Sequence, residues 1–79
     1  MALIGSISEY KEGKEDFESY LERLEQWMAA NTVADEKKVS VFLSLIGADA
    51  YKLLKSLLLP NKPSTKSYAQ LTKALSDHY

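Results

Sequence analysis

The chain has 79 residues, enough for one domain, and its hydrophobic content of 46% and charged content of 27% are typical of a globular protein. A net charge of −1 gives no electrostatic basis for binding nucleic acid or an anionic membrane, so we expect neither partner. The absence of cysteine excludes disulfide bonds and thiolate metal sites and suits the reducing cytoplasm, where we expect the protein to act.

Residues 1–14, called the lead-in below, are expected to be an extended segment that precedes the first helix. Their apolar side chains are Leu3, Ile4, Ile7 and Tyr10. The intervening residues are small and polar, and the pattern is too short for a helix. A turn is expected around Gly13. Two interpretations remain open: an extended segment or short strand that covers the core, or a frayed chain end.

The first helix is predicted over about residues 15–30. Its core face, built from apolar side chains at intervals of three or four, consists of Phe17, Leu21, Leu24 and Met28. Asn31 follows and is a residue type that can take the left-handed conformation that ends a helix. Tyr20 and Trp27 lie at the edge of this face, where they either cap the core or line a groove as exposed aromatics.

The second helix is predicted over about residues 35–46, with Asp35 as its N-cap and Gly47 directly after its end. Its core positions are Val39, Phe42, Leu43 and Ile46. From Val39 onward only Ser40 and Ser44 interrupt the apolar run, so the helix should be central and contacted on several sides. The two small serines share one face, where they would allow another helix to approach closely.

The third helix is predicted over about residues 48–58. Its broad apolar face includes Leu54 and Leu57, which we expect to be core residues. Pro60 cannot continue the helix and ends it. A loop is expected over residues 61–66.

The fourth helix is predicted over about residues 67–79, where Ser67 and Gln70 match a capping box and Leu71 and Leu75 are core positions. The predicted fold class is therefore all-α: a compact bundle of about four short helices, preceded by an extended N-terminal segment and forming a single domain over residues 1–79.

Few side chains suit catalysis, and we expect the chain not to be an enzyme. Its one histidine, His78, lies at a helix end and is interpreted as solvated. Glu18, Glu22 and Glu25 share a helix face that is either solvated or a contact for a basic partner. The sequence has no glycine-rich phosphate loop and no metal-ligand motif, so no cofactor and no metal are expected.

The order and spacing of residues carry a resemblance to a known family. The stretches that carry it are residues 4–10, 15–27, 30–31, 35–39, 42–47, 51–54, 57–60 and 62–63, followed by Tyr68, Leu71, Leu75 and residues 78–79. Over almost the whole chain, this pattern resembles the N-terminal capsid lobe of Gag proteins from gypsy-type LTR retrotransposons. Phe17 departs from the family pattern, which often has tryptophan there, but keeps a large aromatic anchor.

The resemblance implies a retroviral-capsid-like lobe that self-assembles with other Gag copies, through weak lobe–lobe contacts, into virus-like particles containing RNA. We expect the chain to be one lobe of a longer, two-lobed protein, without a zinc knuckle of its own. Related proteins include the neuronal protein Arc, other domesticated Gag proteins and the SCAN domains. They imply two alternatives: an Arc-like lobe that binds short hydrophobic peptides, or a SCAN-like dimerisation module. The groove of a peptide-binding lobe is expected to involve Leu3, Ile4, Ile7, Tyr10, Tyr20 and Trp27.

Overall fold

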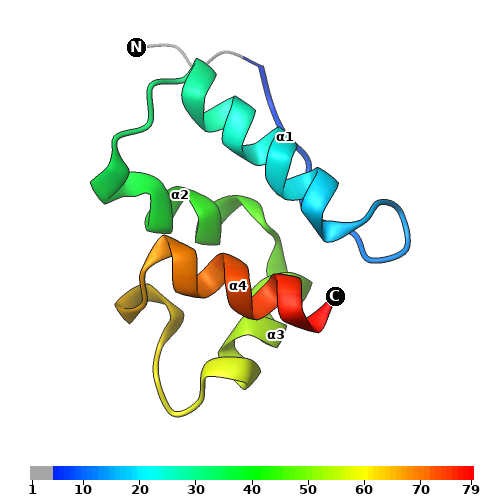
Figure 1. The fold of residues 1–79 in the computed structure, drawn as a ribbon, viewed down its shortest axis with the longest axis vertical. Helices are drawn as coiled ribbons and strands as arrows, with labels where there is room; N and C mark the ends of the chain where they lie inside the picture. Colours follow the sequence, from blue (N-terminus) through cyan, green and yellow to red (C-terminus); the bar gives the residue numbers. More distant parts are fainter. Residues whose placement is uncertain (1–4) are drawn as a thin grey trace.

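The structure is a computed structural model and describes residues 5–79. These residues contain four α-helices, two short 3₁₀ helices and no strand, which confirms the predicted all-α fold. The elements, in chain order, are α1 (Phe17–Ala30), η1 (Asp35–Lys37), α2 (Lys38–Leu45), α3 (Ala48–Leu58), η2 (Pro63–Thr65) and α4 (Tyr68–His78) (Figure 1). None of the described helices is both long enough and apolar enough to cross a membrane.

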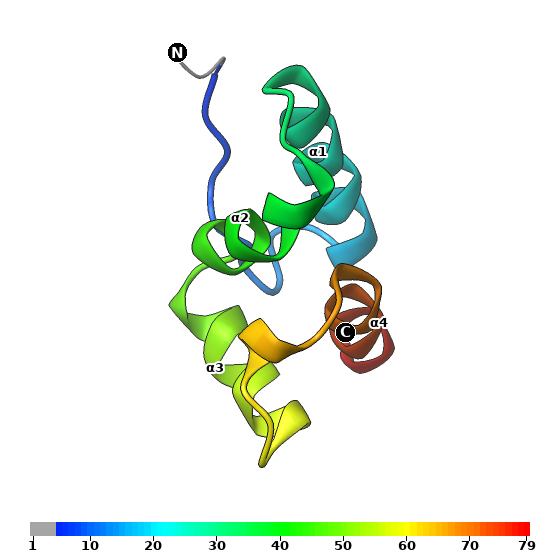
Figure 2. The same cartoon turned by 90° about the vertical axis from the view of Figure 1, so that its left-hand side faces the viewer.

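The described part of the lead-in runs in an extended path beside α1 and then turns over residues 12–14 (Figure 2). It runs antiparallel to α1, since Gly5 lies at Trp27 and Ser8 lies at Tyr20, closer to the start of the helix. Tyr10 fixes the lead-in to the C-terminal end of α2, because its amide donates to the carbonyl of Ile46, the C-cap of α2, at 3.1 Å. The lead-in therefore joins two helices along one face of the bundle.

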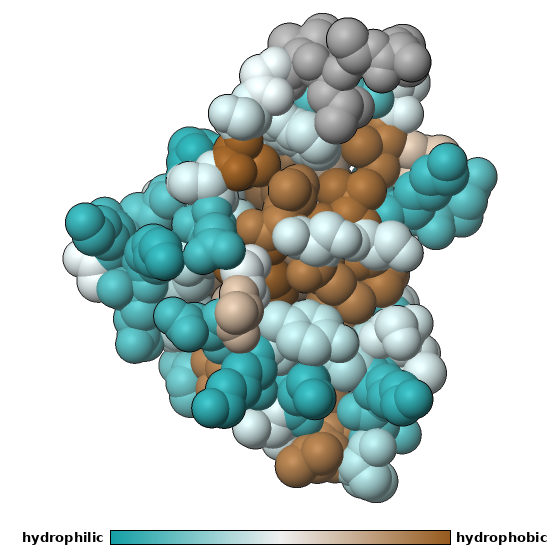
Figure 3. Space-filling view, turned by 180° about the vertical axis from the view of Figure 1, so that it is seen from behind, coloured by the Kyte–Doolittle hydropathy of each residue, from teal (hydrophilic) through white to brown (hydrophobic). Residues whose placement is uncertain are grey.

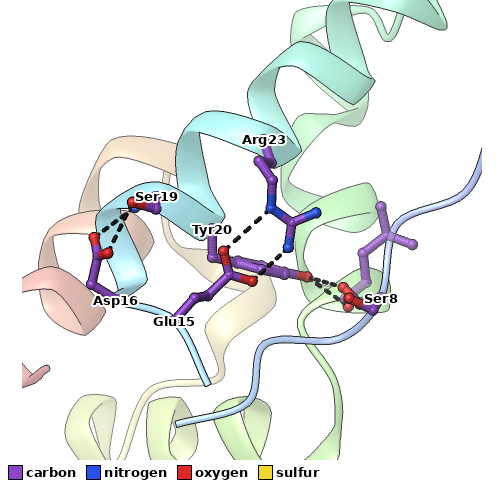
Figure 4. A network of polar contacts seen from close by, with 7 residues as sticks. Ser8, Glu15, Asp16, Ser19, Tyr20 and Arg23 are labelled. Atoms are coloured by element: carbon purple, nitrogen blue, oxygen red, sulfur yellow. Dashed lines mark hydrogen bonds and ion pairs between the residues drawn. The ribbon is translucent and has the colours of Figure 1, made fainter. Parts of the chain in front are cut away.

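The first and last residues of α1 depend on hydrogen bonds at the helix ends, which the apolar periodicity of the sequence does not predict. Asp16 is the N-cap, and its carboxylate accepts from the Ser19 amide and hydroxyl, each at 2.9 Å (Figure 4). The helix therefore starts at Phe17, two residues later than predicted. The prediction that Asn31 takes the left-handed conformation is wrong: Asn31 has a φ of −100°, and Thr32 has the positive φ of 54°.

The segment predicted as one helix over residues 35–46 is divided into η1 and α2. Ala34 is the N-cap of η1, so the predicted N-cap role of Asp35 is wrong; Asp35 lies inside the first turn and pairs with Lys38 at 3.2 Å. Gly47 does separate two helices, with a φ of 93°. A Cβ atom at this position would lie 2.7 Å from the Cβ of Glu9, so both conformation and space require glycine.

The central helix of the bundle is α4, which packs against each of the other three helices. The prediction that α2 is the central helix is wrong, because its face with Ser40 and Ser44 is exposed, although α2 does have neighbours in α4 and η2. The capping box of Ser67 and Gln70 is confirmed, with both reciprocal hydrogen bonds present. The predicted loop over residues 61–66 contains η2, whose Pro63 is buried.

Most predicted core residues are buried: Phe17, Leu24, Met28, Phe42, Ile46, Leu54, Leu71 and Leu75. Leu21, Val39 and Leu43 are partly buried and pack against this cluster. The prediction for Leu57 is wrong, since its side chain is 42% exposed. On α3 the buried positions are Ala50 and Leu54, and one turn later Leu58 turns inward while Leu57 faces the solvent.

Candidate protein-interaction groove

An open apolar groove lies between α1 and α2. Its lining consists of Trp27, Ser40, Val41, Ser44 and Leu45, and its volume is about 230 Å³. Trp27, Val41 and Leu45 are partly buried, while the two serines are exposed. Figure 3 shows a hydrophobic patch on the side of the molecule where the lead-in and α2 lie. The side chains of this groove offer apolar contact area.

Two serines keep the groove open. The Ser44 hydroxyl donates to the Ser40 carbonyl at 2.7 Å, one turn back along α2, and so stays close to its own helix. No bulky side chain therefore stands between Val41 and Leu45 on one side and Trp27 on the other. The sequence predicts that Ser40 and Ser44 admit a neighbouring helix, but in the structure they line a hollow on the surface.

The lead-in is attached to α1 by the side chains of two aromatic residues. The Tyr20 hydroxyl lies 2.8 Å from the Ser8 carbonyl oxygen and 3.1 Å from that of Leu45, so its proton can be donated to either (Figure 4). The Trp27 indole N–H donates to the Gly5 carbonyl at 3.5 Å. Burial raises the pKa of the Tyr20 hydroxyl, which therefore remains a donor.

Arg23 covers the outer side of the Tyr20 ring. Its guanidinium carbon lies 5.5 Å from the ring centroid, and the group is bound by the Glu15 carboxylate through two hydrogen bonds, the Nε–Oε2 distance being 3.2 Å (Figure 4). This pair places a charged cover over a buried ring. Tyr20 is thereby enclosed by the lead-in, α2 and Arg23.

The prediction that Tyr20 is an exposed groove residue is therefore wrong, because none of its surface is exposed. The same correction applies to Tyr10, which is 5% exposed and packs edge to face on Phe17 with ring centroids 5.3 Å apart. Ile7 is partly buried against the core. Leu3 and Ile4 lie outside the described residues.

Of the predicted groove residues that the structure describes, Trp27 alone lines the groove. The other wall comes from α2, which the sequence predicts to be the central helix. The spacing of Ser40 and Ser44, four residues apart beside Val41 and Leu45, was the available signal. This spacing indicates that one face of α2 carries small residues, but it does not indicate whether another helix covers that face.

The remaining polar candidates are on the surface. His78 is exposed, as are Glu18, Glu22 and Glu25. Glu25 accepts a hydrogen bond of 3.0 Å from the Tyr68 hydroxyl, which links α1 to α4. Among residues 5–79, no group of three or more histidine, cysteine, aspartate or glutamate side chains is arranged to hold a metal ion. The described arrangement is suited to contact with another polypeptide.

The chain matches no protein-family model, no curated protein and no solved structure.

Proposed function

We propose that the chain is a structural capsid lobe of a retrotransposon-type or retrotransposon-derived Gag protein, acting in the cytoplasm without a cofactor and without enzymatic activity. It associates with other Gag copies through weak lobe–lobe contacts. The observation that carries this proposal is the open apolar groove lined by Trp27, Val41 and Leu45. Contiguous apolar surface of this kind marks protein-interaction sites on otherwise polar domains.

A second exposed apolar site supports assembly rather than simple pairing. Leu57 and Leu59, at the end of α3, are 42% and 71% exposed. Figure 1 places this end of α3 at the opposite end of the molecule from the lead-in and α1. Two separate apolar sites allow each copy to contact two neighbours. Contacts that are individually weak become strong together when many copies form a lattice.

Sedimentation tests the assembly proposal. At about 10 μM the chain should sediment as one small species. A contact through one small apolar site is expected to have a dissociation constant in the high micromolar range or weaker. At millimolar concentration the parent should self-associate, and Val41→Ser with Leu45→Ser should reduce this association. Ser64→Ala, an exposed residue of η2 that does not line the groove, is the control and should leave association unchanged. A tight dimer at about 10 μM would instead favour the SCAN-like alternative, and a strict monomer at millimolar concentration would contradict the proposal.

The second candidate function is binding of a short hydrophobic peptide, which the lead-in backbone favours. Between residues 5 and 9, no backbone N–H donates to another backbone group of the described chain. An extended peptide can pair with such a free edge as an added strand while its side chains enter the groove.

A peptide titration tests this second function. Short peptides containing proline and aromatic residues should change the fluorescence of Trp27, the chain's one tryptophan, and shift amide signals of the lead-in, α1 and α2. Trp27→Ala should abolish the saturable shifts, whereas Leu59→Ala, at the distant end of α3, should preserve them. Absence of saturable shifts up to millimolar peptide would reject peptide binding and leave the assembly proposal in place.

A further inference from the structure

A different hollow, of about 470 Å³, lies between the turn that precedes α1 and the C-terminal end of α4. Four carboxylates line it, and no basic side chain of the described residues does: Glu12, Glu15, Asp16 and Glu18. We call this hollow the acidic pocket. Lys11 and Lys14 line an adjoining hollow, which shares Tyr10, Glu12 and Tyr79 with the acidic pocket. The acidic pocket shares no lining residue with the apolar groove at Trp27.

The four carboxylates are not equally available to a ligand. Asp16 caps α1 and accepts two hydrogen bonds from Ser19, and Glu15 is bound by Arg23. Glu12 and Glu18 are exposed, and neither has an ion pair or hydrogen bond to another described residue. Two uncompensated negative charges therefore border the pocket.

Three aromatic rings form the apolar wall of the acidic pocket. The ring centroid of Tyr10 lies 5.3 Å from that of Phe17 and 4.8 Å from that of Tyr79, and the last two are 5.6 Å apart. Phe17 and Tyr10 are buried, and Tyr79 is partly exposed. Aromatic faces attract cations through their quadrupole, and the attraction increases where water is excluded.

The Tyr10 hydroxyl is a further polar group without a partner. Tyr10 is 5% exposed, and its hydroxyl forms no hydrogen bond with residues 5–79. No fully buried side-chain polar atom in this range lacks a partner, so the hydroxyl must reach the solvent, and Tyr10 lines the acidic pocket. Burial, followed by the charges of Glu12 and Asp16, raises the pKa of Tyr10. The neutral hydroxyl is thus an unused hydrogen-bonding group in a negative potential.

These features specify the chemistry of a ligand. The pocket offers carboxylate and hydroxyl oxygens as hydrogen-bond acceptors. Among residues 5–79, no three acidic side chains lie close enough together to hold a metal ion. A suitable ligand is therefore an organic cation that only donates hydrogen bonds and has flat apolar faces. The guanidinium group of arginine meets each requirement: it is planar, weakly hydrated, stacks on aromatic rings and binds carboxylates through two parallel hydrogen bonds.

We infer that the acidic pocket binds an arginine side chain of a partner protein, with the guanidinium against the partly exposed ring of Tyr79 and its N–H groups on Glu12 and Glu18. This site does not depend on the apolar groove or on the proposed capsid function. Lysine should bind more weakly, because its ammonium group is a strongly hydrated point charge without a planar face.

An NMR titration with three blocked tripeptides tests the inference. In each peptide the central residue, flanked by glycines, is arginine, lysine or citrulline, and citrulline has the shape of arginine without its charge. The arginine peptide should give saturable amide shifts around Tyr10, Gly13, Phe17 and Ser76. Its affinity should fall as salt is added, since exposed charges are screened. The citrulline peptide should not bind.

Variants of the exposed residues Glu12 and Glu18 keep the test independent of folding, because neither side chain contributes to the core. Glu12→Gln combined with Glu18→Gln should weaken arginine binding about tenfold, equivalent to about 1.4 kcal/mol. The control removes the same charge elsewhere on the surface, with Glu22→Gln and Glu36→Gln, and should bind as the parent does. Tyr79→Leu, which keeps the charges and removes a ring, should weaken binding about threefold. Equal binding of citrulline, parent-like binding by the Glu12 and Glu18 variant, or shifts centred outside the pocket would overturn the inference.

Discussion

The two ends of α1 carry similar aromatic residues in different surroundings. At the N-terminal end, Phe17 and Tyr20 are enclosed, with Tyr10 of the lead-in and Tyr79 after α4 packed against them. At the C-terminal end, Trp27 remains partly exposed beside α2. One helix thus has a closed end and an open end.

The difference arises from what the neighbouring segments contribute. At the closed end, the lead-in supplies the large side chain of Tyr10. At the open end, it supplies Gly5, which has no side chain and offers only its carbonyl to the Trp27 indole. The facing part of α2 adds Ser40 and Ser44, which are also small. Burial of an aromatic residue therefore depends on the volume its neighbours bring, because its own place on a helical stripe is not sufficient.

The largest expected effect is a contrast between the two ends. Phe17→Ala should lower the free energy of unfolding by about 3–5 kcal/mol, because it leaves a cavity in a closed aromatic cluster. Trp27→Ala should cost less than about 2 kcal/mol, because its side chain is partly exposed and its loss opens a groove to water instead of creating a sealed cavity. Urea denaturation of both variants, followed by far-UV circular dichroism, measures the two differences.

Equal destabilisation by the two substitutions would contradict the distinction between a closed and an open end. Leu59→Ala serves as a reference for an exposed apolar residue and should change stability by no more than about 0.5 kcal/mol. A loss of stability in Trp27→Ala as large as that in Phe17→Ala would mean that the groove is filled in solution.

The sequence predicts the helices well because their apolar periodicity is local. The core positions Leu24, Phe42, Leu54 and Leu75 lie on clear stripes, and all four are buried. The prediction that Leu57 is a core residue is wrong because the apolar stripe of α3 is wide enough to include both Leu57 and Leu58. Only Leu58 packs against the core. That selection depends on the neighbouring element, which periodicity does not describe.

The candidate groove is predictable from the sequence only in part. Trp27 lies where sequence reasoning places it, at the edge of the α1 stripe. Tyr20 is assigned to the same edge, but its hydroxyl finds carbonyl partners in Ser8 and Leu45, far away in the sequence, and this allows the residue to be fully buried. A tyrosine at a stripe edge is buried or exposed according to whether such partners exist, and only the tertiary structure shows them.

Tyr20→Phe should have an intermediate effect, because it keeps the buried ring and removes the hydroxyl. The Ser8 and Leu45 carbonyls lose their shared donor, so the free energy of unfolding should fall by about 1–2 kcal/mol. Hydrogen exchange should accelerate at the Tyr10 amide, which bonds to Ile46 beside this site. Tyr51→Phe is the matched control, since the Tyr51 hydroxyl has no hydrogen bond to the described chain. Equal losses in the two variants would show that Tyr20 does not fix the lead-in through its hydroxyl.

The smallest expected effect concerns Asp16, at the start of the closed end. Hydrogen bonds from the Ser19 amide and hydroxyl lower the pKa of Asp16 below its ordinary value of 3.8. A carboxyl whose pKa is lower in the folded state stabilises the fold above its unfolded pKa, and this contribution is lost as the pH falls through the folded value. Asp16→Asn keeps a capping oxygen but cannot titrate.

Between about pH 5 and pH 2, the melting temperature of the parent should therefore fall more steeply than that of the Asp16→Asn variant. Glu36→Gln, an exposed carboxyl without a capping role, controls for the general loss of negative charge and should follow the parent. Parallel curves for the parent and Asp16→Asn would mean that the Asp16 carboxylate contributes nothing by its charge. The start of α1 would then be held by a neutral capping oxygen together with the aromatic packing, because the amide of the Asp16→Asn variant would hold the helix start as well as the native carboxylate does.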